Sequence, residues 1–579
     1  MYLLGIHNGI HDAAACLFRD YELVAAVSLE RLTRRKNDGV TPAAEIPLQA
    51  IDECLRIGGI ARADVDVVCA SRAAFDVGSY RLRGRWWIKQ QYYRALGRRR
   101  LVLMTDMMRK QRAKDAAAIF DGDSFKRAYG FDKASLHFYN HHAAHGVPAY
   151  FFSEFDAALI YTADGIGDNI SYSASTARRG DIGILSGGDA TLFDRYKVNS
   201  VGLLYCYFTD ALGFIWNRHE GKVTGLSAFG KPVAAPEILG HFSVDANGEI
   251  ASDFPGYEAM HAFARDVCQR LSREDAAASV QEATERLVCH AVETYLRATG
   301  LTAVAVGGGL FANVRLNRAI LEQTSAERIF VYPAMGDEGL VLGGCLLYLR
   351  ERDGAEAWHR NRYRLESLYL GRDHTAAFKD AAARYPGLAV EPGRQVDRAA
   401  DLLAEGKVVA IYTGRMEYGP RALGARTIMA SPVQREVNDT INKRLERSEF
   451  MPFAPVVLEE HARAVFDVND GNAHAARFMT ITCDVRPEWR ARIKAVVHVD
   501  GSARPQTIRR ADNPLYYDVL AAFHARTGLP VLVNTSFNVH EEPIVDTPDQ
   551  ALKSLVDGRI DHILTEDGLY TPTRPGRFS

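Results

Sequence analysis

Ala303-Val304-Ala305-Val306-Gly307-Gly308-Gly309 joins a short apolar run to a turn of three glycines, the pattern of a buried strand that ends in a tight loop. Before it, Ala276–Thr299 alternates apolar and polar side chains at helical spacing, and Gly300 suits the end of such a helix. After it, Asn313–Gln323 is again helical in character. This order of elements predicts an α/β domain whose glycine turn offers backbone N–H groups to a phosphate.

Two strand–loop–strand units nearer the N-terminus indicate an internal duplication. The first joins Tyr2–Ile6 to Ala13–Phe18 through a polar turn. The second joins Ala157–Ala163 to Ile170–Thr176 in the same way. The repeat of this unit predicts two similar halves in the N-terminal part of the chain.

A second α/β unit is expected towards the C-terminus. Arg350–Arg364 is charged and poorly periodic, so we place a domain boundary there. Beyond it, strands are expected at Val408–Tyr412, Phe478–Val485 and Pro530–Val533, with helical segments between them.

Composition bounds the class of protein. The chain has 579 residues, of which 47% are hydrophobic and 25% are charged, which is ordinary globular composition. Disorder, collagen and coiled coil are thereby excluded for the chain as a whole, and its length corresponds to about four folding units. The formal net charge of −2 gives no overall attraction to nucleic acid or to anionic membranes.

Cysteine usage and the N-terminus favour the cytoplasm. The eight cysteines form no C-x-x-C pair, so neither a zinc knuckle nor a disulfide framework is indicated. Residues 1–12 lack the basic start and unbroken apolar core of a signal peptide, and no run of about 18 apolar residues occurs. We therefore expect a cytoplasmic enzyme without a membrane span.

One segment departs from the average charge. Arg81–Arg112 carries eleven lysines and arginines, with Trp86, Trp87, Tyr92 and Tyr93 among them. This pattern fits a nucleic-acid or membrane-surface element. It fits better a surface insertion that covers an acceptor pocket or a partner subunit, because the rest of the chain is not basic.

A histidine pair marks the first candidate site. His141 and His145 share one face if a helix begins near His141, a common arrangement for a divalent metal and also for an ordinary polar helix start. Asp164 ends a predicted strand and Asp337 lies in a loop before an apolar helical run. Two histidines with one or two aspartates suit Fe²⁺, Mn²⁺ or Zn²⁺.

An arginine- and glycine-rich loop marks the second candidate site. Gly414–Arg426 follows a predicted strand and contains Arg415, Arg421 and Arg426. Arginine offers a planar fork to phosphate and glycine allows close backbone approach, so the loop suits an anion as well as a solvated basic surface. Further residues that could complete this site are Lys443, Arg444, Arg447, Arg504, Ser536 and Asn538.

Two residues near the N-terminus could take part in catalysis. His11, next to Asp12, could act as general base for an alcohol if it lies near a metal or a phosphate. Lys36 lies in a basic run and could neutralise a phosphate. Taken singly, each also fits a structural polar role.

Motifs along nearly the whole chain, in a specific order, carry a family resemblance. They are His11-Asp-Ala13, Glu30 to Lys36, His141-His-x-x-His145, Asp164-Gly-x-Gly167, Gly225-Leu-x-x-x-Gly230, Gly307-Gly-Gly309 with Asn313, Gly336-Asp-Glu-Gly339, Gly419-Pro-Arg-Ala-Leu-Gly424, Pro452-Phe-Ala-Pro455, His498-Val-Asp-Gly501 and Asn534-Thr-Ser-Phe-Asn538. Together they resemble the ATP-dependent O-carbamoyltransferases of the tobramycin, cephamycin and nodulation-factor type.

The resemblance implies a domain organisation. Residues 1–355 would be similar to the tRNA threonylcarbamoyl-transferring domain, a duplicated actin/Hsp70/sugar-kinase-like (ASKHA) fold, with the basic insertion at about residues 80–130. Residues 356–370 would be a linker, and residues 371–579 a YrdC-like α/β domain.

The resemblance also implies an activity. The YrdC-like unit would form carbamoyl-adenylate from carbamoyl phosphate and ATP, with Mg²⁺. The N-terminal unit would pass the carbamoyl group to a hydroxyl of a small-molecule natural product, as in antibiotic biosynthesis. The implied partners are this acceptor and a second copy of the chain, without nucleic acid or membrane.

Site residues carry over from the family by position. His141, His145, Asp164 and Asp337 would bind Fe²⁺ or a similar ion, with Glu338 as an alternative ligand. His11 would be the base, with Lys36 supporting developing charge. Gly308, Gly309 and Asn313 would bind nucleotide. Carbamoyl phosphate and ATP would be held by Arg421, Lys443, Arg444, Arg447, Arg504, Ser536 and Asn538.

Three other functions use related domains or the same fold. In the transfer of threonylcarbamoyl to tRNA, the two activities usually belong to separate proteins. The basic segment nevertheless leaves RNA as an alternative partner. Carbamoyl transfer in hydrogenase maturation normally requires cysteine zinc motifs, which this sequence lacks. A nucleotide-binding regulator with a dead site would not need the two histidines and two aspartates.

Overall fold

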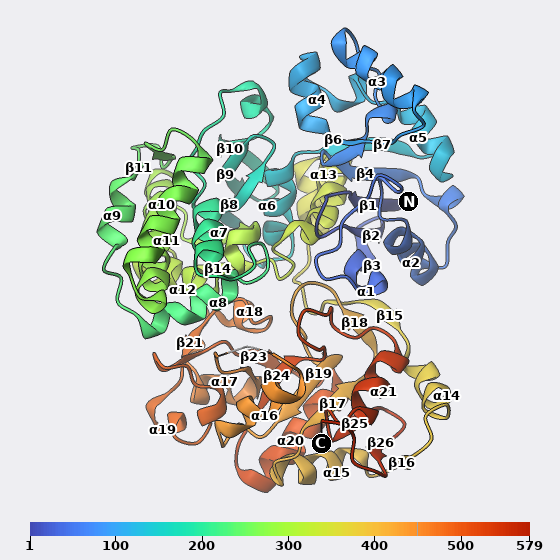
Figure 1. The fold of residues 1–579 in the computed structure, drawn as a ribbon, viewed down its shortest axis with the longest axis vertical. Coiled ribbons are helices and arrows are strands. Elements are labelled where there is room, and N and C mark those ends of the chain that lie inside the picture. Colours follow the sequence, from blue (N-terminus) through green and yellow to red (C-terminus); the bar gives the residue numbers. More distant parts are fainter. Residues whose placement is uncertain (448–449, 579) are drawn as a thin grey trace. The chain divides into compact units, whose positions relative to one another are not determined.

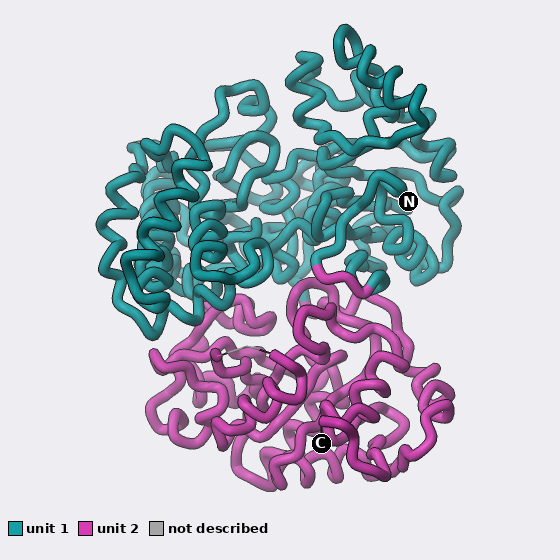
Figure 2. Tube along the Cα trace, viewed as in Figure 1, with its two compact units in different colours: residues 1–33, 37–365 teal, residues 34–36, 366–579 magenta. Residues whose placement is uncertain are grey.

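The computed structural model describes residues 1–447 and 450–578, and these form two compact units (Figure 2). The N-terminal unit comprises residues 1–33 and 37–365. The C-terminal unit comprises residues 34–36 together with the chain from residue 366 onwards. The division at 365/366 lies within residues 356–370, where the sequence predicts a linker.

The N-terminal unit begins with a five-stranded sheet in the order β3-β2-β1-β4-β7 (Figure 1). Its strands are β1 (Tyr2–His7), β2 (Ala14–Arg19), β3 (Glu22–Ser28), β4 (Val67–Ser71) and β7 (Ser135–Tyr139). The first three form an antiparallel meander, and β4 and β7 extend it in parallel. Near-continuous apolar runs form these strands because both faces of the sheet are buried.

A second five-stranded sheet repeats this topology in the order β10-β9-β8-β13-β14. Its strands are β8 (Ala157–Gly167), β9 (Ile170–Arg178), β10 (Asp181–Ser186), β13 (Ala303–Gly307) and β14 (Arg328–Val331). The meander β8-β9-β10 is antiparallel, and β13 and β14 add in parallel. The predicted duplication and the actin/Hsp70/sugar-kinase-like class of the N-terminal unit are therefore confirmed.

The helices that follow the last strand of each sheet, α6 (His141–Phe151) and α13 (Leu340–Arg360), pack against each other. Their backbones approach closely, since a Cβ on Gly343 of α13 would lie 2.0 Å from the carbonyl oxygen of Ala144. Only glycine permits this contact. It brings the start of α6 and the loop before α13 to one place.

Each half carries an insertion. In the first half it lies between β4 and β7 and contains β5 (Ala74–Asp76), α3 (Arg85–Ala95), β6 (Leu101–Leu103), α4 (Met104–Gln111) and α5 (Gly122–Tyr129). In the second half it lies between β10 and β13 and contains α7 (Val201–Ala211), α8 (Glu220–Leu226), α9 (Ala235–Gly240), β11 (Phe242–Val244), β12 (Ile250–Ser252), α10 (Tyr257–Arg270) and α11 (Arg273–Thr299).

Remaining helices of the N-terminal unit include α1 (Leu29–Thr33), α2 (Leu48–Gly58) and α12 (Val314–Gln323). The helix predicted up to Thr299 is α11, and Gly300 ends it in the left-handed conformation, with φ of 66°.

The C-terminal unit is built on an eight-stranded mixed sheet in the order β16-β26-β25-β17-β19-β24-β20-β23. These strands are β16 (Leu388–Glu391), β26 (Leu569–Pro572), β25 (His562–Leu564), β17 (Val409–Tyr412), β19 (Arg426–Ala430), β24 (Val531–Ser536), β20 (Ala454–Leu458) and β23 (Gln506–Ile508). This is the predicted second α/β unit; its YrdC-like assignment stays a prediction.

Helices and short strands complete the C-terminal unit. They are β15 (Tyr369–Asp373), α14 (Phe378–Ala382), α15 (Gln395–Ala404), β18 (Arg415–Glu417), α16 (Glu436–Arg444), α17 (Glu459–Val465), α18 (Ala473–Ala476), β21 (Cys483–Asp484), α19 (Pro487–Arg490), β22 (Ser502–Ala503), α20 (Pro514–Thr527) and α21 (Pro548–Val556).

One prediction of local structure is wrong. Most of Phe478–Val485 is not a strand: Met479 has φ of 56° and Thr480 donates a hydrogen bond from Oγ1 to the carbonyl of Ala475, so the run first closes the turn after α18. The charged boundary segment is largely helical, because α13 continues to Arg360 across a break at Gly354. Buried Trp358 anchors this part by donating from its indole nitrogen to the carbonyl of Leu346.

All eight cysteines are free thiols, and seven of them are buried. Within residues 1–447 and 450–578, the structure contains no helix long and apolar enough to cross a membrane.

Candidate metal centre and anion site

Helix α6 places two imidazoles one turn apart at its N-terminal end. Asn140 caps the helix by accepting a hydrogen bond from the backbone N–H of Ala143 at 2.9 Å. With the helix beginning at His141, the rings of His141 and His145 lie on one face, and their Nε2 atoms are 3.1 Å apart. The helix predicted from this spacing is thus present, although Pro148 lies within it.

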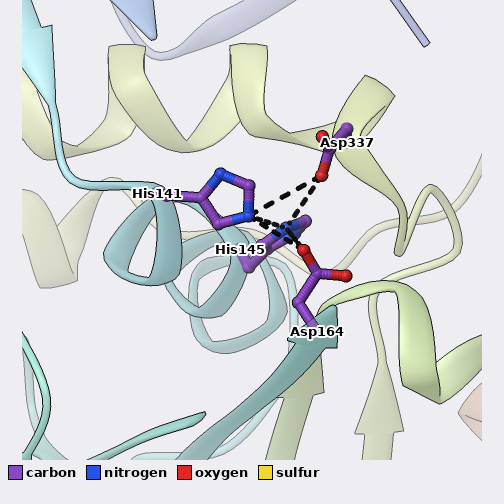
Figure 3. A group of neighbouring side chains, drawn as sticks. All are labelled: His141, His145, Asp164 and Asp337. Atoms are coloured by element: carbon purple, nitrogen blue, oxygen red, sulfur yellow. Dashed lines mark hydrogen bonds and ion pairs between the residues drawn. The ribbon is translucent and has the colours of Figure 1, made fainter. Parts of the chain in front are cut away.

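Two aspartates from other elements meet this histidine pair (Figure 3). Asp164 lies in the C-terminal part of β8, and its Oδ2 is 3.0 Å from His141 Nε2 and 3.8 Å from His145 Nε2. Asp337 lies just before α13, and its Oδ1 is 3.4 Å from His145 Nε2 and 3.7 Å from His141 Nε2. One ligand atom from each of the four residues lies within 4.8 Å of every other.

The donor set fits a divalent transition metal. Ligand atoms about 2.1 Å from a common ion lie roughly 3.0 to 3.5 Å from one another, close to the observed separations. Two neutral imidazoles and two carboxylates match the charge of a 2+ ion and suit Fe²⁺, Mn²⁺ or Zn²⁺. Glu338 lies outside this group; its carboxylate lies close to Gly336, and burial raises its pKa to about 7.

Electrostatics within the cluster favour charged carboxylates. Burial alone would raise the pKa of Asp164, but hydrogen bonds with His141 and His145 outweigh it and hold that pKa well below its ordinary value. Burial likewise opposes ionisation of Asp337, and the neighbouring histidines lower its pKa. Both aspartates are therefore ionised and able to bind a cation at neutral pH.

The predicted nucleotide glycines hold the cluster in place. Gly309 donates its backbone N–H to Asp164 Oδ1 at 3.1 Å, which leaves Oδ2 directed at the histidines. Gly308 has φ of 105°, and a Cβ there would lie 2.3 Å from the carbonyl oxygen of Ala163. Asn313 caps α12 by accepting from Leu316 and exchanges hydrogen bonds with buried Gln281. A nucleotide role for these three residues stays a prediction.

His142, between the two ligand histidines, is structural. Its Nε2 donates to the carbonyl of Ile170 at 3.0 Å, so Nδ1 accepts from the hydroxyl of Thr162 at 2.7 Å. Burial lowers the pKa of His142 to about 3, which keeps the ring neutral. It therefore fixes α6 against the second sheet.

His11 lies beside the cluster, and its role as a base stays a prediction. Its Nδ1 is 3.0 Å from Asp12 Oδ2 and 4.0 Å from Asp337 Oδ2. The hydrogen bond with Asp12 raises the pKa of His11 to about 9 in spite of its desolvation. Lys36 is not in the same compact unit: residues 34–36 belong to the C-terminal unit, where Arg34 donates to the carbonyls of Pro543 and Ile544.

In the C-terminal unit, Arg421 stands out among the predicted anion-binding residues. Its Nε is buried and has no hydrogen-bond partner among the described residues. Burial lowers the pKa of this guanidinium to about 10, and no carboxylate among the described residues opposes that effect. A desolvated cation without a counter-charge is costly unless an anion binds it, so half-buried Arg421 is the strongest candidate among the predicted anion-binding residues.

The other two arginines of this loop are structural. Arg426 is fully buried, stacks on the ring of Tyr412, and donates to the carbonyls of Thr413 and Ala425. Arg415 donates to the carbonyls of Leu370 and Gly371. The interpretation of three arginines as one anion site is therefore wrong for these two, because backbone carbonyls hold their guanidinium groups in place, although Nε of Arg426 has no hydrogen-bond partner among the described residues.

The remaining predicted residues divide into two groups. Arg447, Ser536 and Asn538 converge, but Arg447 donates to the hydroxyl of Thr535 and to the carbonyls of Ser536 and Asn538. Arg444 pairs with Asp561 at 2.9 Å. Two predicted residues take no part in these contacts. Lys443 is exposed near the end of α16, and Arg504, which follows β22, is half-buried.

Comparison with known proteins accounts for both units. The family model described as Carbamoyltransferase N-terminus matches residues 2–346, and that described as Carbamoyltransferase C-terminus matches residues 400–571. The chain belongs to the carbamoyltransferase family. The resemblance recognised in the motifs is thus confirmed.

Relatives of this carbamoyltransferase include two nodulation proteins. Nodulation protein NolNO of Sinorhizobium fredii is 32% identical over 572 residues, which cover 96% of this chain and 78% of that protein. Nodulation protein NolO of Bradyrhizobium diazoefficiens is 35% identical over 444 residues, 73% of this chain and 77% of that protein. Among solved structures, a ROK hexokinase from Thermus thermophilus is similar with a TM-score of 0.33 at 15% identity, over 61% of this chain and all of that one.

The carbamoyltransferase contains a residue beside the two histidines and two aspartates that the sequence did not reveal. Buried His7, at the end of β1, has its Nε2 3.5 Å from Asp337 Oδ2, while its Nδ1 is 3.1 Å from the hydroxyl of Ser71. The internal duplication was the only feature of the sequence that could have pointed to His7. His7 ends the first strand of the first meander, much as Asp164 lies towards the end of the first strand of the second.

A second residue missed from the sequence shapes the Arg421 loop. Buried Glu417 accepts, at one carboxylate oxygen, the backbone N–H groups of Leu423, Ala425 and Arg426 at 2.7 to 3.0 Å. The side chain of Gln506 donates to the carbonyl of Leu423 from the other side. Together these contacts fix the turn that carries Arg421.

Substituting Glu417 tests this role. Glu417→Ala leaves three buried N–H groups without an acceptor, and each such group costs about 1 to 3 kcal/mol. We expect urea denaturation to show a free energy of unfolding of the C-terminal unit lower by about 3 kcal/mol or more. Glu417→Gln retains one carbonyl oxygen and is expected to recover part of the lost free energy of unfolding. An equal loss in both variants would contradict the role of Glu417 as acceptor for the three N–H groups.

The glycines of β8 allow a matched test of the cluster's geometry. A Cβ on Gly167 would lie 2.0 Å from Cδ2 of His141, whereas the nearest atom to a Cβ on Gly165 is 3.6 Å away. Gly167→Ala must displace the His141 ring, so we expect it to weaken metal binding roughly tenfold or more. Gly165→Ala is the control and should bind as the wild type does; calorimetric titration with Mn²⁺ or Zn²⁺ measures both. Equal affinities would contradict the geometry.

Proposed function

We propose that this carbamoyltransferase makes carbamoyl-adenylate from carbamoyl phosphate and ATP and transfers the carbamoyl group to a hydroxyl of a small-molecule natural product. The observation that carries the proposal is the convergence of His141, His145, Asp164 and Asp337 in the N-terminal unit. Arg421 in the C-terminal unit supports a separate site for anionic substrates.

The first step takes place in the C-terminal unit. Water cleaves carbamoyl phosphate to carbamate and phosphate, and a carbamate oxygen then attacks the α-phosphorus of ATP, with pyrophosphate leaving. Both substrates are polyanions, and Arg421 lacks a counter-charge within the described chain. Its planar guanidinium can donate two parallel hydrogen bonds to one phosphate group.

The second step takes place in the N-terminal unit. The acceptor hydroxyl attacks the carbamoyl carbon, the C–O bond to AMP breaks, and the hydroxyl proton passes to His11. The hydrogen bond to Asp12 orients this ring with Nδ1 protonated, which leaves Nε2 to accept the proton. An Fe²⁺, Mn²⁺ or Zn²⁺ ion held by the four ligands would supply Lewis acidity, and its charge would lower the pKa of His11 towards the working range.

The products of ATP turnover test the proposal. Incubation of the protein with ATP, carbamoyl phosphate and Mg²⁺ is expected to give AMP, pyrophosphate and phosphate, with pyrophosphate formation dependent on carbamoyl phosphate. Phosphorus-31 NMR resolves these products. ADP as the main nucleotide product, or pyrophosphate release that is independent of carbamoyl phosphate, would contradict adenylate formation.

A further inference from the structure

The basic segment of the first insertion is not used by the proposed chemistry. Residues 77–105 contain eight lysines and arginines and no aspartate or glutamate. Within this segment, α3 packs through buried Gln90, which donates to the carbonyls of Val77 and Tyr80. Trp86 is half-buried, with the ammonium groups of Lys89 and Lys110 at 4.6 and 4.8 Å from its ring. This side of α3 is thus fixed to the fold.

The opposite side of α3 is apolar and exposed. Trp87, Ile88, Tyr92 and Leu96, here called the α3 face, are 52%, 63%, 61% and 46% exposed. Ile88, Tyr92 and Leu96 follow at i, i+4 and i+8, so they form one stripe along the helix and its C-cap. Exposed Arg85 and Lys89, three residues before Ile88 and Tyr92, flank the stripe, and exposed Arg98, Arg99 and Arg100 follow the helix.

We propose that the α3 face docks on an anionic lipid membrane surface. Aliphatic and aromatic side chains bordered by lysine and arginine are typical of helices that lie in the headgroup region. Each nearby cation adds attraction to anionic lipids. The formal net charge of −2 predicts no membrane partner. This average over the chain does not reveal the local concentration of positive charge around α3.

Two other occupants fit the face less well. A second copy of this chain packed symmetrically on it would bring two acid-free cationic segments together, and like charges repel. Single-stranded nucleic acid would use the cations and the aromatic rings, but exposed Ile88 and Leu96 offer it neither stacking nor hydrogen bonds. An anionic membrane satisfies the apolar stripe and the charges together.

Vesicle co-sedimentation of the full chain tests the proposal. At 50 mM salt we expect binding to phosphatidylglycerol–phosphatidylcholine vesicles at least tenfold tighter than to phosphatidylcholine alone. The double variant Ile88→Ser, Leu96→Ser should bind the phosphatidylglycerol vesicles at least tenfold more weakly. The double variant Arg85→Gln, Lys89→Gln should show a loss of the same size. The control is Ile184→Ser with Val233→Ser, two residues of similar exposure elsewhere, at 67% and 56%. It should bind as the wild type does.

Several results would overturn this assignment. They are failure of the wild type to bind phosphatidylglycerol vesicles, equal binding to both vesicle types, and undiminished binding by both α3 variants. If an excess of single-stranded RNA displaced the vesicles, and RNA bound more tightly than vesicles, the face would be assigned to nucleic acid instead. None of these readouts depends on carbamoyl transfer, so the outcome is separate from that of the proposed function.

Discussion

His141→Ala is expected to lose the metal ion of the N-terminal unit. The substitution removes one of four ligand atoms, the Nε2 that lies 3.0 Å from Asp164 and 3.1 Å from His145. Loss of a group that only orients a ligand costs 10- to 100-fold in affinity, so loss of the ligand itself should cost about 100-fold or more. Metal analysis of the purified protein is expected to show close to one ion per wild-type chain and little in the variant.

A thermal scan gives a second measure of the same loss. A ligand present at 100 times its dissociation constant stabilises the folded state by about 2.7 kcal/mol. A chelator should therefore lower the melting temperature of the wild type and leave that of His141→Ala unchanged. His137→Ala, on β7 outside the cluster, is the matched control. If His141→Ala retained metal at the level of His137→Ala, the four-residue centre would be wrong.

Arg421→Met is expected to abolish pyrophosphate formation without destabilising the fold. Two charge-assisted hydrogen bonds to a phosphate contribute roughly 1.5 to 3 kcal/mol each, so their loss should slow the reaction about 10²- to 10⁴-fold. The guanidinium has a buried Nε without a hydrogen-bond partner in residues 1–447 and 450–578, and removing it also removes a desolvation cost. The free energy of unfolding should therefore stay the same or rise.

Arg426→Met provides the contrast on the same loop. Its guanidinium donates to the carbonyls of Thr413 and Ala425. The Ala425 carbonyl also accepts the backbone N–H of Thr413 at 3.1 Å, so the Thr413 carbonyl is the acceptor most affected by the substitution. We expect this variant to be destabilised by about 1 to 3 kcal/mol. Pyrophosphate assays and urea denaturation of the two variants distinguish binding from structure. Full activity of a folded Arg421→Met protein would refute the anion site.

Local patterns in the sequence predicted those features that depend on nearby residues. The i, i+4 spacing placed His141 and His145 on one helix face, and the strand–loop–strand repeat predicted the two sheets. Asp164 and Asp337 were assigned to the same site by family resemblance, because no spacing brings β8 and the loop before α13 together. Their meeting depends on the packing of α6 against α13 through Gly343.

Burial and long-range partners account for what the sequence could not predict. Arg415, Arg421 and Arg426 have the same chemistry in one loop, and only the fold shows that two of them bind carbonyls. Glu417 was overlooked because a lone carboxylate in a basic loop does not reveal three backbone donors. Phe478–Val485 has a strand-like composition, but the hydrogen bond from Thr480 to Ala475 closes a turn there instead.

We propose that adenylate formation and carbamoyl transfer occupy separate sites in the two units. The most direct test is the rate of carbamoyl-phosphate-dependent pyrophosphate release by folded, metal-free His141→Ala protein. We expect a rate close to that of the wild type, because Arg421 and its loop lie in the other unit. Loss of pyrophosphate release in this folded variant would contradict the two-site scheme.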